Sequence, residues 1–127
     1  MERVQGIGGV FLRSQDREAL CRWYAANLGL EIDESWWGTS IAWAEQHDAA
    51  HAMTVWSAFK GDTSYFGEGG KAFMINFRVR DLDAMMAQLR GNGCAVDDKV
   101  EDSEFGRFGW VTDPEGNRVE LWQPPAP

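Results

Sequence analysis

Glu120 is the residue whose type and position point most directly to chemistry, because it lies on a short alternating segment near the end of the chain. Val119 and Leu121 lie on one face of this segment, and Glu120 and Trp122 lie on the other. A carboxylate beside an indole can serve as a general base or can anchor an aromatic ligand. The simpler alternative is a solvated residue on an edge strand, and strand alternation leaves both interpretations open.

The residues before Glu120 predict the hairpin that positions it. Residues 113–117 read Asp-Pro-Glu-Gly-Asn, in which Asp113 can accept backbone N–H groups and Gly116 can adopt a left-handed φ. An apolar run precedes this turn, and an alternating run follows it. We therefore expect strands over residues 107–112 and 117–123, joined by a short loop.

The composition limits the possible partners. The 127 residues suit one domain that is long enough to bury a core. Twenty acidic residues against 12 basic ones give a net charge of −8, which argues against nucleic acid and anionic membranes. No apolar run is long enough to span a membrane, and Cys21 and Cys94 lack metal-ligand spacing. We expect a cytoplasmic protein with reduced cysteines and a small-molecule ligand.

The same order of elements is expected twice along the chain. Each half contains a strand, a helix capped by an aspartate (Asp16 or Asp81) and three further strands. Halves of about 60 residues could not each bury a core, so we expect their sheets to join around a shared concave space. The expected strands cover residues 6–14, 30–36, 39–45 and 51–58, then 72–80, 95–100, 107–112 and 117–123, with a Gly-rich connector at 60–70.

This pattern resembles the vicinal oxygen chelate superfamily, which includes glyoxalase I, the bleomycin resistance proteins, the fosfomycin resistance proteins and the extradiol dioxygenases. The resembling stretches are Arg-Ser-Gln-Asp at 13–16, Trp-Tyr at 23–24, Leu-Gly-Leu at 28–30, Asn-Phe-Arg-Val-Arg-Asp-Leu-Asp at 76–83 and Asp-Pro-Glu-Gly-Asn-Arg-Val-Glu-Leu at 113–121. The resemblance implies an α+β fold, in which two βαβββ modules form an open, cup-shaped mixed sheet with the helices outside. It implies one domain over residues 1–127, with module one at 4–59, a connector at 60–70 and module two at 71–123.

The resemblance also implies where a metal ion would bind. Metal-dependent members hold one divalent ion at the cup floor, with two ligands from each module. The matching positions here are Gly9, Thr54, Met74 and Glu120, and only Glu120 suits a hard or borderline cation. We therefore expect no metal and no other cofactor. An atypical site through His47 or His51 is the alternative, which strand parity disfavours for His51.

Strand alternation gives a list of residues that should face the cup. It is an aromatic floor that carries two arginines and one carboxylate, which suits a planar or amphipathic ligand. Internal pairing of the arginines with the carboxylate is the alternative. In the connector, Tyr65 and Phe66 could form a lid or a hydrophobic plug. The candidate ligand-binding residues are Phe11, Arg13, Thr54, Trp56, Met74, Asn76, Arg78, Trp110 and Trp122, and the candidate catalytic residue is Glu120.

Two hypotheses for the function follow, and the sequence leaves the ligand of either one open. The first is a metal-free protein, similar to the bleomycin resistance branch, that binds a small aromatic or amphipathic molecule. The second is a lyase, isomerase or dioxygenase of the same superfamily that uses Glu120 as a base or in an atypical metal site. Both are expected to be homodimers, because the sheet edges of a single chain are open. A regulatory or assembly domain is a third possibility.

Overall fold

Eight strands and two helices form the fold in a computed structural model, which describes residues 1–28, 30–42, 53–113 and 115–126. The first half contributes β1 (Val4–Ser14), α1 (Arg17–Leu28), β2 (Gly38–Ala42) and β3 (Met53–Lys60). The second half contributes β4 (Phe73–Val79), α2 (Leu82–Gly91), β5 (Ala95–Val96), β6 (Glu101–Ser103), β7 (Gly106–Thr112) and β8 (Arg118–Gln123).

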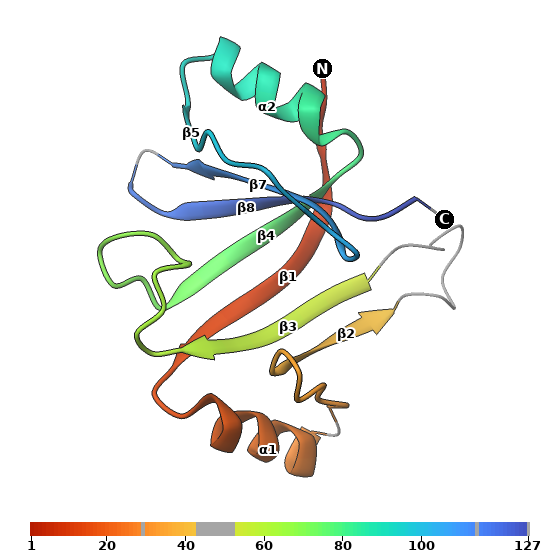
Figure 1. Cartoon of the computed structure of the whole chain (residues 1–127), viewed down its shortest axis with the longest axis vertical. Coiled ribbons are helices and arrows are strands. Elements are labelled where there is room, and N and C mark those ends of the chain that lie inside the picture. Colours follow the sequence, from red (N-terminus) through yellow and green to blue (C-terminus); the bar gives the residue numbers. More distant parts are fainter. Residues whose placement is uncertain (29, 43–52, 114, 127) are drawn as a thin grey trace.

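The strands make one mixed sheet in the order β2-β3-β1-β4-β8-β7-β5, with β6 paired to β7. Strands β1 and β4 pair antiparallel at its centre. On one side β1 pairs parallel with β3, and on the other β4 pairs parallel with β8, so the two halves repeat the same arrangement. The sheet curls, and α1 and α2 lie at its two ends (Figure 1). The predicted cup-shaped α+β fold is confirmed.

Both helices begin where the aspartates predict. The backbone N–H of Ala19 donates to Asp16 Oδ1 at 3.0 Å, and that of Ala84 donates to Asp81 Oδ1 at 3.0 Å. Such caps satisfy N–H groups that have no partner in the first turn of a helix. Each helix then covers one end of the sheet on its outer face. The cluster under α2 contains Val79, Leu82, Met85, Met86 and Leu121, and the cluster under α1 contains Cys21, Trp37 and Ala58.

The predicted strand over residues 30–36 is wrong. Only an isolated bridge between Asp33 and Gly38 forms there, and a turn follows it. The Asp33 carboxylate accepts hydrogen bonds from the backbone N–H and the hydroxyl of Ser35, at 2.9 and 2.6 Å, and Trp37 adopts a left-handed φ of 57°. These local hydrogen bonds favour a turn over an extended strand.

Two other predictions differ from the structure or lie outside it. Of the predicted strand at 95–100 only β5 (Ala95–Val96) forms, and β6 follows outside it at Glu101–Ser103. Residues 43–52, which include His47, His51 and parts of two predicted strands, lie outside the described residues. Within the described residues, no helix is long and apolar enough to cross a membrane.

Candidate functional site

The concave face of the sheet carries a buried aromatic cluster. Phe11 of β1, Met74 of β4 and Trp110 of β7 pack together there with Phe66, which comes from the connector between β3 and β4. All four side chains are at most 6% exposed. The strand faces predicted for Phe11 and Met74 are therefore correct, and Trp110 meets them in the fold although the three residues are far apart in the chain.

Glu120 lies at the centre of this face and accepts three hydrogen bonds. Asn76 and Trp110 lie opposite it in the pairings of β8 with β4 and β7. Asn76 Nδ2 donates to Glu120 Oε1 at 2.7 Å, and Trp110 Nε1 donates to Oε2 at 3.0 Å. The hydroxyl of Tyr65 donates to the same Oε2 at 2.5 Å. Sequence analysis found the carboxylate and two of its partners, but it did not connect Tyr65 with Glu120.

The electrostatic setting of Glu120 is unusual for a carboxylate. Its side chain is 1% exposed, and the three groups that donate hydrogen bonds to it in the described part of the chain are all neutral. Burial raises the pKa of Glu120, while the hydrogen bonds from Tyr65, Asn76 and Trp110 and the charge of Arg118 oppose that rise. Burial and the adjacent charge of Glu120 likewise raise the pKa of Tyr65. Burial therefore favours the protonated form of Glu120, whereas its hydrogen bonds favour the carboxylate.

Arg118 is a member of the site that sequence analysis missed. Its guanidinium lies over the Trp110 ring at 4.7 Å and over the Tyr65 ring at 5.6 Å from their centroids. It donates to the backbone oxygen of Tyr65 at 2.6 Å and to Asp97 Oδ2 at 2.6 Å. The signal was present in the sequence, because residues 118 and 120 share one face of an alternating strand.

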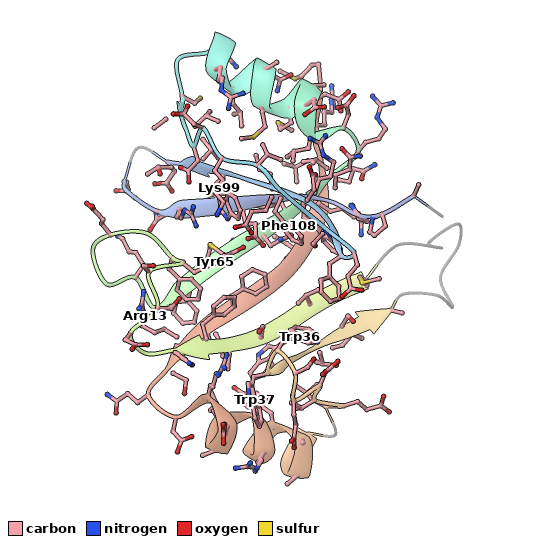
Figure 2. The ribbon with its side chains drawn as sticks, viewed as in Figure 1. Arg13, Trp36, Trp37, Tyr65, Lys99 and Phe108 are labelled. Carbon is pink, nitrogen blue, oxygen red and sulfur yellow. The ribbon has the colours of Figure 1, made fainter. Side chains whose placement is uncertain are left out.

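The two aromatic residues of the connector form a plug. The Tyr65 ring stacks on the Phe59 ring with centroids 5.3 Å apart, and the centroid of the Phe66 ring lies 5.1 Å from that of Phe59. Phe66 is only 1% exposed. Figure 2 shows Tyr65 over the central strands, whereas Trp37 lies beside α1. Of the two predicted alternatives for this segment, a lid or a plug, the structure has the plug.

Arg13 lies on the predicted face, but its guanidinium holds the connector in place. It donates to the backbone oxygens of Lys71, Gly61 and Thr63 at 2.9, 3.0 and 2.8 Å. It also lies over the Phe66 ring, 5.2 Å from the centroid. These contacts use three of the five N–H groups of the guanidinium, and the connector covers it. A ligand would therefore reach Arg13 only if the connector moved.

The strand face predicted for β3 is wrong. The Trp56 ring packs on Tyr24 of α1 with centroids 4.5 Å apart and joins the cluster under that helix. Thr54 shares this outer face by alternation, so neither residue lines the cup. Val55 and Phe59 face the cup instead. Both faces of β3 carry apolar residues, so its hydrophobic pattern could not decide which face is buried under the helix.

Trp122 and Asn76 complete the floor near the start of β1. Trp122 is 5% exposed, stacks on Phe108 with centroids 6.2 Å apart and donates from Nε1 to the backbone oxygen of Phe105 at 2.8 Å. A Cβ on Gly8 would lie 2.0 Å from Asn76 Oδ1 and 3.1 Å from Trp122, so only glycine fits there. Asn76 Oδ1 is buried and accepts no hydrogen bond from the described residues. Arg78 pairs with Trp122 in the sheet register.

A surface depression lies beyond this site. It has a volume of about 660 Å³ and is lined by the connector and by the turn between β7 and β8. Arg118 is the residue that it shares with the cup, and Glu120 does not line it. Around Glu120 the concave face is packed with buried side chains, among them Phe11, Phe66, Met74 and Trp110.

Comparison with known proteins identifies the family. A family model described as a glyoxalase-like domain matches residues 9–122. The chain belongs to this family. The match covers both halves of the sheet and includes Gly9, Met74 and Glu120. The resemblance to the vicinal oxygen chelate superfamily is thereby confirmed, and no curated protein matches the chain.

Solved structures of other proteins show the same fold. Methylmalonyl-CoA epimerase from Mycobacterium tuberculosis is 22% identical with a TM-score of 0.62, over 97% of this chain and 90% of that one. A variant of the Streptomyces coelicolor epimerase in complex with 2-nitronate-propionyl-CoA is 19% identical with a TM-score of 0.71, over 98% and 100%. A glyoxalase/bleomycin resistance protein/dioxygenase superfamily member from Vibrio splendidus 12B01 is 12% identical with a TM-score of 0.57, over 97% and 99%. At these identities the likeness concerns the fold alone.

The cup floor of this glyoxalase-like chain does not fit the metal ion of metal-dependent members. Gly9 has no side chain, Met74 offers a thioether, and Thr54 faces away from the cup. The oxygens of Glu120 already accept three hydrogen bonds. In the part of the chain that the structure describes, no group of three or more His, Cys, Asp or Glu side chains could hold a metal ion.

Proposed function

We propose that this glyoxalase-like protein binds a small aromatic or amphipathic molecule in its cup without a metal ion. The observation that carries the proposal is the buried carboxylate of Glu120. Aromatic rings lie around it, and the groups that donate hydrogen bonds to it among the described residues are neutral. Burying a charge in this way is costly, and such groups concentrate at functional sites. The rings would supply stacking surfaces, and Glu120 would orient the ligand through one polar contact.

The structural neighbours support a small-molecule role. The Streptomyces coelicolor epimerase holds 2-nitronate-propionyl-CoA, which is a molecule with a small polar end and a long carrier. In our proposal the cup of this chain takes the smaller, ring-bearing part of a ligand. The depression beside Arg118 could take a polar extension, because it is lined by both acidic and basic residues.

A second candidate function is proton transfer next to a carbonyl group, as an isomerase or lyase would require. The raised pKa of Glu120 favours it, because a base works best when its pKa lies near the working pH. The neutral hydrogen bonds from Asn76 and Trp110 would hold the carboxylate in a fixed orientation. Tyr65 would have to leave before any substrate could reach the Oε2 atom.

One set of measurements tests both candidates. Purified protein is titrated with indole, 1-naphthol and propionyl-CoA by calorimetry, and exchange of deuterium beside the thioester carbonyl is followed by NMR. A binding protein should bind at least one probe at one site per chain and should keep most of its affinity for a neutral probe in Glu120→Gln. An enzyme that uses this carboxylate should exchange deuterium and lose that turnover by orders of magnitude in the same variant. A folded protein that binds no probe contradicts the binding proposal.

We also propose that the protein is a homodimer. Strand β2 lies at an edge of the sheet and exposes Ile41 by 48%, and Phe73 at the start of β4 is 62% exposed. Exposed apolar side chains and open sheet edges favour association with a second chain. Light scattering at micromolar concentration tests this, and the mass of a single chain would contradict it.

A further inference from the structure

Tyr65 occupies the position in the cup where a ligand would be expected. It is the one hydrogen-bond donor to Glu120 that comes from the connector, since Asn76 and Trp110 belong to the sheet. Its ring stacks on Phe59 at 29° and meets Trp110 edge-on, with centroids 5.8 Å apart and an angle of 88°. The surroundings of this ring therefore combine a stacking face, an aromatic wall and one charged acceptor.

The hydrogen bond between Tyr65 and Glu120 has the length of a charge-assisted one. Its oxygens are 2.5 Å apart, and O–H···O⁻ bonds of about 2.5–2.7 Å are stronger than neutral ones. The carboxylate is buried, so losing this donor would leave part of a charge without compensation. A molecule that enters this position must therefore replace the donor as well as the ring.

The segment that carries Tyr65 is anchored by the buried Phe66 ring and by hydrogen bonds from two arginines. Arg118 binds the backbone oxygen of Tyr65, and Arg13 binds those of Gly61, Thr63 and Lys71. The residues around these points are largely exposed, including Gly61, Asp62 and Ser64 on one side and Glu68 to Gly70 on the other. Swinging Tyr65 out of the cup would break the hydrogen bond from Arg118 and disturb the packing of Phe66, but it would leave the clusters under both helices intact.

We infer that the ligand is a phenol. Its ring takes the position of the Tyr65 ring in the cup, and its hydroxyl donates to Glu120 in place of the Tyr65 hydroxyl. This inference rests on the proposed function and specifies its ligand. An aromatic hydrocarbon would stack equally well but would leave Glu120 without its third donor. An aryl carboxylate would meet the charge of Glu120 in a chain whose net charge is already −8. A neutral ring with a hydroxyl group matches both features of the site.

The inference has a quantitative consequence, because ligand and plug compete for one position. The apparent affinity is the intrinsic affinity multiplied by the fraction of molecules in which Tyr65 has left the cup. Tyr65→Phe keeps the ring of the plug but removes its hydroxyl. Since a hydrogen bond to a charged group is lost, the plug should weaken and p-cresol should bind about 10- to 100-fold more tightly to the variant.

The test is a titration of p-cresol into wild type, Tyr65→Phe and Tyr24→Phe. Tyr24 stacks on Trp56 at the opposite face of the sheet, so its variant is a matched control that should bind like wild type. The probe 4-methylanisole has the same ring without a donor and should bind far more weakly to every form. Equal affinity of wild type and Tyr65→Phe for p-cresol would overturn the inference while leaving aromatic binding intact.

A second measurement needs no variant. Saturating p-cresol should speed hydrogen exchange of the backbone amides in residues 61–70 of the wild type, because the displaced connector loses its contacts. Unchanged or slower exchange in bound protein would contradict displacement of Tyr65, whatever happens with the variants. If indole binds but neither p-cresol nor 1-naphthol does, the phenol class is wrong. If no aromatic probe binds, the proposed function itself fails.

Discussion

Two substitutions of Glu120 should have very different effects on stability. Glu120→Ala removes the only acceptor of Asn76 Nδ2 and Trp110 Nε1 among the described residues, and both groups are buried. Each buried donor left without a partner costs about 1–3 kcal/mol. Relief from burying the carboxylate offsets part of that cost. We therefore expect Glu120→Ala to lower the free energy of unfolding by about 2–4 kcal/mol at pH 7.

Glu120→Gln should be tolerated, because the site can satisfy an amide. Gln Oε1 can accept from Tyr65 and Trp110 at the position of the present Oε2. If the Asn76 amide turns over, its Oδ1, which now has no partner, can accept from Gln Nε2. Three hydrogen bonds to a charged group then become bonds to a neutral amide, which weakens each by about 1 kcal/mol, but the cost of burying a carboxylate is removed. We expect a change of less than about 2 kcal/mol at pH 7.

The difference between wild type and Glu120→Gln should depend on pH. Burial raises the folded pKa of Glu120 above its ordinary value of 4.5, so the fold prefers the protonated side chain. This contribution to stability is fully present below pH 4.5 and is lost as the pH rises through the folded pKa. Between these two pKa values the contribution of Glu120 to the free energy of unfolding falls by up to about 1.4 kcal/mol per pH unit, whereas Gln does not titrate and makes no such contribution.

Urea unfolding, followed by tryptophan fluorescence between pH 5 and 8, measures this difference. Taking the wild type minus the variant cancels the other titrating groups, including the two histidines. The difference should fall with rising pH and then level off. A difference that rises with pH would refute the reasoning, because the hydrogen bonds and Arg118 would then outweigh burial and lower the pKa.

Three further substitutions and one analysis test the structure. Arg13→Met removes three hydrogen bonds to the connector and should speed proteolysis near residues 60–72, whereas a control such as Arg13→Lys, which retains a donor, should be cut more slowly. Trp56→Ala should lower the free energy of unfolding in urea by about 2–4 kcal/mol and leave ligand affinity unchanged, because this ring packs under α1. Weaker ligand binding in this variant would show that Trp56 lines the cup after all. Trp122→Ala should cost about 3–5 kcal/mol, since its side chain is 5% exposed, and a loss below 1 kcal/mol would contradict the packing. Elemental analysis of protein purified without chelator should find far less than one metal ion per chain, and stoichiometric metal would reverse our conclusion about the cup floor.

The local sequence was sufficient to predict turns and helix caps, in which the interacting groups lie within a few residues of one another. Asp113 Oδ1 accepts from the backbone N–H groups of Glu115 and Asn117, both at 2.9 Å, and Gly116 has a φ of 84°, as the turn prediction requires. The helix caps at Asp16 and Asp81 also span only three residues. Such contacts form with little loop-closure entropy, so residue types and spacing alone determine them.

Strand faces were predictable only where one face is clearly more apolar than the other. In β8, Val119 and Leu121 alternate with Glu120, and its orientation follows directly. In β3, Val55 and Phe59 alternate with Trp56 and Ala58, so both faces can be buried. The position of α1 decided between them, and that position depends on packing across the whole half of the sheet.

The contact between Tyr65 and Glu120 could be decided only by the tertiary structure. The two residues are separated by 55 positions, and the connector that carries Tyr65 has no hydrophobic periodicity to indicate a face. Its path is determined by Arg13 and Arg118, whose guanidinium groups bind backbone oxygens that any residue type would offer. The sequence therefore determined that a carboxylate would face an aromatic cup. The fold determined that the side chain of Tyr65 fills this cup, because only the assembled sheet brings Arg13 and Arg118 within reach of the connector.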